Sequence, residues 1–200
     1  MPFTPSSQTR APAMTSPDPA VIRALAAALV QRPRSNLADL ARSAGISRAT
    51  LYRMAPTRDE IIELLTAEGL RMMEAALSRG ENEPAGPRAA LDAMTALMLE
   101  NRDLFLFVFN LFGEAGGPQD DAYYLPPEWR ALEDRFDAFF LRGQRLGEFR
   151  IELPAAWLSD FYWSCLYGAA YAIARGRMAP AGAQGAIMTS FLAGAAVMKE

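Results

Sequence analysis

The stretch from Gly45 to Ala55, GISRATLYRMA, holds the side chains whose types and spacing suggest the most specific chemistry in this sequence. Ser47 fits the N-cap of a short helix, and Arg48 and Ala49 follow in its first turn. An arginine placed there can form the paired hydrogen bonds that recognise guanine in the major groove of DNA. A small alanine permits contact with a thymine methyl group. We therefore predict that this helix enters DNA.

The next residues along the chain are of types that can bind the phosphates of DNA and balance their negative charge. Thr50 and Tyr52 carry hydroxyl groups that can bond phosphate oxygens, and Arg53 and Arg58 add positive charge at the far end of the helix. The helix N-terminus contributes a partial positive charge of its own. Helix-glycine-helix patterns are common, and a helical tyrosine more often packs than binds, so these residues alone leave both interpretations open.

Charge is unevenly distributed along the 200-residue chain, whose net charge is −3. Residues 1–60 carry eight arginines and four acidic residues, whereas the remaining residues carry twelve basic and nineteen acidic ones. A basic N-terminal part suits a polyanionic partner such as DNA. A solvated surface with a chance asymmetry explains the same numbers, so charge alone does not decide.

The sequence contains no histidine, one cysteine and one lysine, which excludes several kinds of site within the chain. Neither a Ser-His-Asp triad, nor a Cys-His pair, nor a His/Cys zinc site, nor a P-loop with its lysine can form. We expect no cofactor. Cys165 fits a buried small side chain in a reducing cytosol better than a reactive thiol.

No signal peptide is visible, and the longest apolar run, residues 161–174, is too short to span a bilayer. We therefore expect a cytoplasmic protein with no membrane partner.

Helix-favouring residues dominate, and the composition predicts an all-α protein of about nine helices. Residues 1–17 contain four prolines and are expected to form a disordered tail. Asp18 can cap the first helix and Asn36 the second, and Gly45 supplies the left-handed residue that ends the second helix. Residues 18–65 are thus predicted to form a three-helix head that contains a helix-turn-helix.

The rest of the chain, residues 66–200, is predicted to form a helical body that a long helix joins to the head. Thr57 to Glu60 form a capping box at the start of this helix. Its apolar face is expected to carry Ile61, Leu64, Leu65 and Met72, with Glu68 among them. Further helices are expected near residues 88–100, 102–113, 128–146, 155–175 and 180–198.

The segment NLADLARSAGISRATLYRMAPTRDEIIELL resembles the DNA-binding segment of the TetR family of bacterial transcriptional regulators. The matching residues are Leu40, Ala41, Ala44, Gly45, Ile46, Ser47, Thr50, Leu51, Tyr52 and Ile61. The resemblance is close over about residues 20–65. Beyond them it holds only in outline, with GQRLGEFR before the eighth helix as a common family feature.

This resemblance implies a role for each matching position in binding a double-stranded DNA operator. Asn36, Thr50, Tyr52 and Arg58 are expected to contact phosphates, and Ser47, Arg48, Ala49 and Arg53 to lie at or near the bases. Two residues depart from the family pattern. Ala55 stands where the family usually has an aromatic residue, and Arg58 replaces the usual lysine, which keeps the charge but changes its geometry.

The resemblance also implies a small-molecule effector, because this family commonly holds a ligand among the helices of its body. A mostly apolar pocket with a few hydroxyl groups suits a neutral or cationic aromatic or lipophilic molecule. From spacing alone, aromatic stripes line a core more often than a pocket, so both interpretations stay open. The residues expected at the ligand are Phe105, Phe109, Phe112, Trp129, Phe136, Phe140, Tyr162, Trp163 and Tyr167.

A homodimer is the third implication, because members of this family pair their last two helices across a two-fold axis. Small residues are frequent in both helices of this chain and would allow a close approach. The residues expected at the interface are Gly168, Ala172, Ile187, Phe191, Ala195 and Met198. The expected function is a repressor that a small ligand releases from a palindromic operator.

Two rival functions remain at this point. An all-helical enzyme or carboxylate metal protein would need an acidic cluster, and Glu114, Asp120 and Asp121 supply the only one worth naming, in a stretch that is more simply a solvated loop. A helical dimer that binds small molecules and carries a non-functional DNA head is the other alternative. Ala55 is its only support in the sequence.

Overall fold

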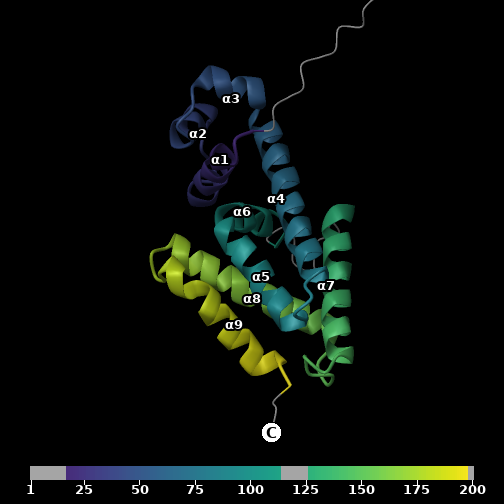
Figure 1. The fold of residues 1–200 in the computed structure, drawn as a ribbon. Helices are drawn as coiled ribbons and strands as arrows, with labels where there is room; N and C mark the ends of the chain where they lie inside the picture. The colour runs from purple at the N-terminus through teal and green to yellow at the C-terminus, as the bar shows by residue number, and fades with distance from the viewer. Residues whose placement is uncertain (1–16, 114–125, 198–200) are drawn as a thin grey trace, which may run out of the picture.

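The computed structural model describes residues 17–113 and 126–197. Within these ranges the chain forms nine α-helices, and its β pairing is limited to an isolated bridge between Phe149 and Ala196. The prediction of an all-α fold is confirmed for the described residues, and nearly all of the predicted tail lies outside them. In chain order the helices are α1 (Pro19–Gln31), α2 (Leu37–Ser43), α3 (Arg48–Met54), α4 (Arg58–Glu81), α5 (Pro87–Glu100), α6 (Arg102–Gly113), α7 (Pro127–Arg145), α8 (Ala155–Ala174) and α9 (Pro180–Ala195) (Figure 1).

Short polar side chains define where the three helices of the head begin. Asp18, Asn36 and Ser47 each accept a hydrogen bond from a backbone N–H in the first turn of α1, α2 and α3, at 2.8, 3.0 and 3.0 Å respectively. Each bond satisfies a donor that the helix itself leaves unpaired. Gly45, with φ of 67°, makes the tight turn between α2 and α3. The sequence therefore encodes a local helix-turn-helix.

The head encloses a small core of aliphatic side chains. Leu25 of α1, Leu40 of α2, Leu51 of α3 and Ile61 of α4 are fully buried. Ala55, which departs from the family pattern, is only 2 % exposed. This position is therefore enclosed even though its side chain is small.

The long helix α4 runs from the head into the body without a break, so the predicted boundary between residues 65 and 66 falls inside one helix. Its buried face differs from the predicted one. Leu64 and Met72 are only half-buried, whereas Gly69 and Met73 are buried. A side chain at Gly69 would collide with Val108 of α6, so glycine at this position permits close packing of the two helices.

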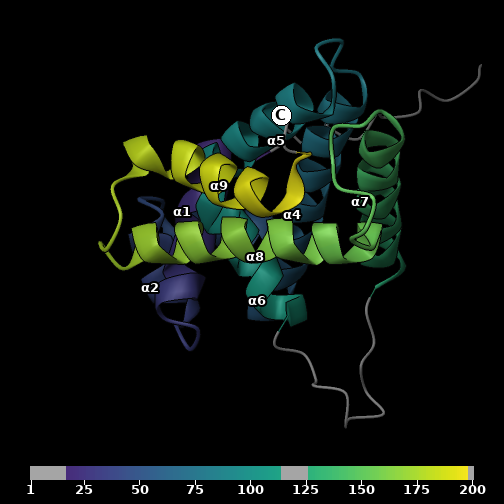
Figure 2. The same ribbon diagram turned by 90° about the horizontal axis from the view of Figure 1, so that it is seen from below.

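The helices of the body pack around α4, and the body forms the end of the molecule that lies farthest from α3 (Figure 1). α5, α6 and α7 pack on α4, and α8 packs on α7 and α9. Seen from below, α8 and α9 lie side by side and form that end of the molecule (Figure 2). α1 also packs on α6, so the head touches the body away from α4. None of the helices in the described ranges is long and apolar enough to cross a membrane.

Candidate DNA-binding surface and ligand cavities

One side of helix α3 packs on the rest of the head, and the other side is exposed. Leu51 is its only fully buried residue, and it fixes the helix on the head core. Arg48, Ala49, Tyr52 and Arg53 are exposed on the remaining surface, with Tyr52 51 % exposed. The side chains predicted to meet DNA from this helix are therefore accessible to a partner.

Two arginines of α3 have no competing partner within the described part of the chain. The side chains of Arg48 and Arg53 make neither a hydrogen bond nor an ion pair there. An arginine that is already paired must break that pair before it binds a base or a phosphate, whereas these two need not. This geometry supports the prediction that both reach DNA.

The predicted polar contacts are partly engaged in shaping the head. Ser47 Oγ and Thr50 Oγ1 lie 2.9 Å apart, and Ser47 Oγ also accepts the N–H of Thr50. Asn36 uses its Oδ1 as the cap of α2, which leaves its Nδ2 as a donor. Arg58 Nη2 donates to the carbonyl of Pro33 at 2.6 Å, so this arginine links α4 to the loop between α1 and α2.

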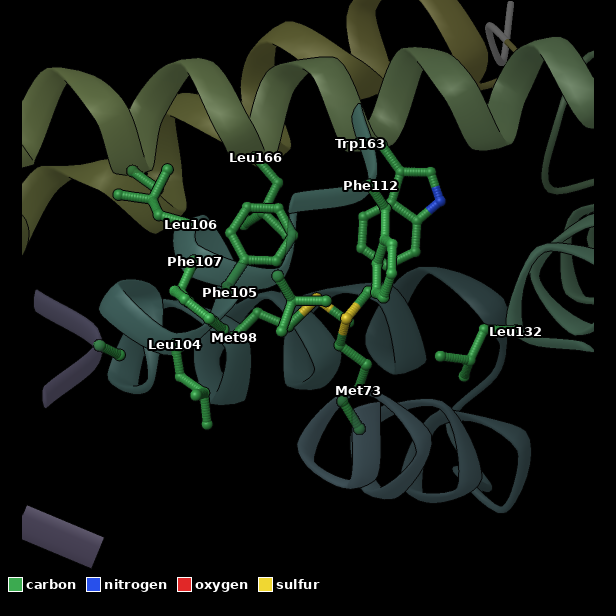
Figure 3. Packing of buried hydrophobic residues seen from close by; sticks show 14 of the residues in the cluster. Met73, Met98, Leu104, Phe105, Leu106, Phe107, Phe112, Leu132, Trp163 and Leu166 are labelled. Atoms are coloured by element: carbon green, nitrogen blue, oxygen red, sulfur yellow. The ribbon is translucent and has the colours of Figure 1, made fainter. Parts of the chain in front are cut away.

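Most of the aromatic residues expected around a ligand instead pack on one another in the body. Phe105, Phe136, Phe140 and Tyr162 are fully buried. The rings of Phe136 and Trp163 lie 4.3 Å apart between centroids, and that of Phe105 stacks on Trp163 at 6.0 Å. Figure 3 shows Phe105, Phe112 and Trp163 close to Met73 and Met98. The structure therefore places these rings in the core, and the prediction that they contact a ligand stays a prediction.

Tyr162 illustrates this packing in the core, because its hydroxyl group already has a hydrogen-bond partner inside the protein. Its oxygen lies 3.0 Å from Thr95 Oγ1, and Thr95 in turn donates to the carbonyl of Leu91 at 2.7 Å. Burial raises the pKa of the Tyr162 hydroxyl well above its ordinary value. Burial likewise raises the pKa of the Cys165 thiol, which fits the prediction of a small, unreactive side chain. Both groups therefore stay neutral and structural.

One cavity, here called the α4–α7 cavity, has a volume of about 740 Å³ and opens between these two helices. Ile62, Leu70 and Leu132 supply part of its apolar lining, and Glu63 and Glu128 add carboxylates that form no ion pair in the described part of the chain. The size falls in the usual range for small-molecule sites. None of the nine predicted aromatic residues lines it.

The two arginines of the α4–α7 cavity are neutralised by acidic neighbours. Arg71 pairs with Glu68, and Arg135 Nη2 lies 2.8 Å from Glu81 Oε2. These hydrogen bonds raise the pKa of Arg71 and of Arg135 above its ordinary value. With both arginines paired, the unpaired carboxylates leave the cavity with a negative character.

A second cavity, here called the junction cavity, lies where the head meets the body and has a volume of about 400 Å³. Residues of α1, α4, α6 and α8 line it, and Ile62 borders both cavities. Tyr167 is the one predicted ligand residue that it contains.

Comparison with known proteins places this arrangement in a family. NfxB, an HTH-type transcriptional regulator of Pseudomonas aeruginosa, is 35% identical over 183 residues that cover 91% of this chain and 96% of NfxB. LfrR, an HTH-type transcriptional repressor of Mycolicibacterium smegmatis, is 27% identical over 176 residues, which cover 88% of each chain. No protein-family model matches the sequence.

Solved structures show the same fold. The TetR-like regulator LfrR from Mycobacterium smegmatis in complex with proflavine superposes with a TM-score of 0.63 at 23% identity, covering 90% of this chain and 96% of LfrR. The MbdR regulator from Azoarcus sp. CIB gives a TM-score of 0.67 at 17% identity, covering 88% of this chain and 96% of MbdR.

The chain belongs to the TetR family of transcriptional regulators. Membership in this family confirms the expectation of a DNA-binding regulator that is not an enzyme. The acidic residues Glu114, Asp120 and Asp121, which carried the rival enzyme hypothesis, lie outside the described residues. Within the described ranges, no group of three acidic or cysteine residues could hold a metal ion.

The predicted dimer surface of this TetR-family member stays a prediction, and its residues differ in how accessible they are to a partner. Gly168 is exposed and faces open space, and Ala172 is half-buried. Ile187, Phe191 and Ala195 are instead buried at 2 % exposure or less, because they hold α9 on the body core. These three residues offer a partner almost no accessible surface in this structure. Met198 lies outside the described residues.

Trp157 was missed by the sequence analysis and is 55 % exposed in the first turn of α8. Large aromatic side chains are rarely left this exposed without a partner. The position of Trp157 on a face of the helix that points away from the core could have indicated this exposure from the sequence. The lining of the α4–α7 cavity was also missed. Its residues come from segments about sixty positions apart, so no local spacing could reveal it.

Proposed function

We propose that this TetR-family protein is a dimeric repressor that binds a palindromic operator and is released from it by a small aromatic or lipophilic ligand. The observation that carries the proposal is that Arg48 and Arg53 are exposed on the outer face of α3 and that no described residue pairs with their side chains. Unpaired arginines on a short exposed helix of a basic head suit a polyanion with a readable groove. We expect it to act in the cytoplasm.

In the proposed complex, Arg48 reads a base and its neighbours position the helix. Ala49 and Ser47 allow α3 to approach the base edges, and Arg53 lies near them. Asn36 Nδ2, the hydroxyl groups of Thr50 and Tyr52 and the guanidinium of Arg58 bind phosphates on either side. Since Arg58 already bonds the carbonyl of Pro33, its phosphate contact also braces the loop before α2.

The proposed dimer forms through the outward faces of α8 and α9. Gly168, Gly182 and Gly185 all face open space, so two copies of these helices can approach closely. Trp157 supplies a large apolar side chain at one end of this surface. The resulting two-fold axis presents two copies of α3, and a palindrome read by them needs half-sites about one helical turn, roughly 34–36 Å, apart.

The proposed effector site is the α4–α7 cavity. Its apolar walls and unpaired Glu63 and Glu128 suit a flat aromatic cation. Proflavine is such a molecule, and it is bound in a solved structure of the similar regulator LfrR. A ligand against Ile62 and Leu70 presses on α4 within a few turns of Arg58. Because α4 carries the head, this displacement changes the separation of the two copies of α3, and linkage requires operator and effector to weaken each other equally.

Proflavine titrated into the protein–operator complex tests this proposal, with the operator fragment obtained by selection from random DNA. We expect proflavine to lower operator affinity, and we expect Ala131→Trp, which fills the cavity wall on α7, to abolish that effect while operator binding without ligand is retained. An operator affinity that is unchanged by saturating proflavine would refute the cavity as the site for aromatic cations.

A further inference from the structure

We propose that the junction cavity is a second ligand site, which binds an aromatic carboxylate that carries a ring N–H or O–H group. Its position between the head and the body separates it from the α4–α7 cavity on the other side of Ile62. Its volume of about 400 Å³ is enough for one or two fused rings with a short acidic substituent. The proposed function assigns no ligand to this cavity.

Charge distinguishes the two cavities. Among the described residues, the junction cavity is lined by one charged residue, Arg58, and by no acidic residue. A second guanidinium, that of Arg175, lies 5.6 Å from the ring of Tyr171, which lines the cavity. Positive charge at a cavity whose described lining holds no carboxylate attracts an organic anion and disfavours the cation that suits the α4–α7 cavity. A carboxylate can also accept two parallel hydrogen bonds from a guanidinium.

Aromatic and aliphatic surfaces provide the place for a ring. The rings of Tyr167 and Tyr171 stack at 5.8 Å with 9° between their planes, and Tyr171 is 43 % exposed. Leu29 and Phe107 contribute apolar wall on the head side and the body side. Phe109 already stacks on Tyr167 at 4.9 Å, so the exposed ring of Tyr171 is the surface on which a ligand ring can stack. The cavity therefore combines a stacking surface with an anion-binding rim.

One polar group of the cavity lacks a partner. Asn110 lines the cavity, and its Oδ1 is buried without a hydrogen-bond donor. An enclosed acceptor without a donor is unfavourable. A ligand N–H or O–H at that point would satisfy it. This is why a donor on the ring is part of the proposal.

Arg58 couples the junction cavity to DNA, and this step rests on the proposed function. Its Nη2 now donates to the carbonyl of Pro33, in the loop that precedes α2, and its side chain is exposed. A ligand carboxylate would compete for the same guanidinium with that carbonyl and with a DNA phosphate. The ligand and the operator are therefore antagonists.

Calorimetric titration of the full-length protein, without DNA, tests the binding step with indole-3-acetate as the probe. We expect saturable binding that is weakened about tenfold or more by Arg58→Gln or by using the neutral indole-3-acetamide, since each removes a charge-assisted hydrogen bond. Naphthalene-1-acetate, which lacks the N–H, should bind about fivefold or more weakly. Leu111→Trp, which fills the opening from α6, should abolish binding.

Ala131→Trp is the matched control, because it fills the other cavity and should leave indole-3-acetate affinity unchanged. Absence of saturable binding, equal affinity for the acid and the amide, or equal affinity in wild type and Leu111→Trp would each overturn the proposal. Melting temperatures show that each variant is folded. Since these titrations contain no DNA, their outcome is independent of operator binding; a second titration against the operator complex tests only the antagonism.

Discussion

The head and the body of this protein use their large side chains in opposite ways. In α3 a single residue, Leu51, is fully buried, and the arginines and the tyrosine around it face outward. In the body the large rings face inward, and Phe136 and Phe140 are fully enclosed. The head is therefore expected to bind through its exposed side chains, whereas the stability of the body depends on its buried side chains. This difference separates positions that set binding from positions that set stability.

The largest effect should come from emptying the aromatic core. Phe136→Ala removes a fully buried ring that contacts Trp163, and we expect the free energy of unfolding to fall by about 3–5 kcal/mol. Urea denaturation followed by circular dichroism measures this loss. Tyr52→Ala, at an exposed site of α3, is the control and should leave stability nearly unchanged. Equal losses for the two variants would break the distinction between enclosed and displayed residues.

The next effect concerns the surface of the body that faces outward. Gly168→Arg places a charge on the open face of α8, and we expect it to weaken dimerisation by about 3 kcal/mol or more, because an unpaired charge would be buried between the copies. Analytical ultracentrifugation would then show monomer at concentrations where the wild type is dimeric. Ala75→Arg, on the exposed side of α4, should not change the assembly. A Gly168→Arg protein that stays dimeric would exclude this face as the interface.

A smaller effect should separate two arginines of the head. Arg48→Ala should lose about 1–3 kcal/mol of preference for the operator over random DNA, because the bidentate contact with a base is removed. Arg58→Ala should weaken binding to all sequences alike, because phosphates carry no sequence information. Fluorescence anisotropy on both kinds of DNA measures the two losses. If both variants lose affinity equally on specific and random DNA, the assigned roles are wrong.

The smallest effect should come from the cap of α3. Ser47→Ala removes the acceptor for the N–H of Thr50, and we expect a loss of about 1 kcal/mol in stability. Thermal unfolding of this variant beside Ser43→Ala, an exposed serine of α2, measures it. A loss confined to Ser47→Ala would show that the display of α3 depends on a single local hydrogen bond, and equal losses would show that it does not.

The contrast between the two regions also explains what could be predicted from the sequence. The helix starts at Asp18, Asn36 and Ser47 and the turn at Gly45 depend on neighbours within three residues, so the pattern of the head is legible along the chain. α3 has only seven residues, and its exposed face follows from the one residue, Leu51, that is fully buried. The head and its exposed residues were therefore predictable.

The body was predictable as helices but not as a site. An aromatic stripe has the same spacing whether it fills a core or lines a cavity, and Phe105 and Phe136 proved to be core. The two faces of α9 are both small and apolar, so the sequence could not show that Ile187 and Phe191 turn inward. The cavities are lined by residues far apart in the chain, such as Glu63 and Glu128, which local patterns do not bring together.

Selection of the purified full-length protein on a random-sequence DNA library is the most direct test of the central claim that the displayed face of α3 reads DNA. We predict enrichment of a palindrome whose half-site centres lie about one helical turn apart, and loss of that enrichment in Arg48→Ala. A folded dimer that enriches no sequence would contradict the claim. It would favour a helical dimer that binds small molecules and carries a non-functional DNA head.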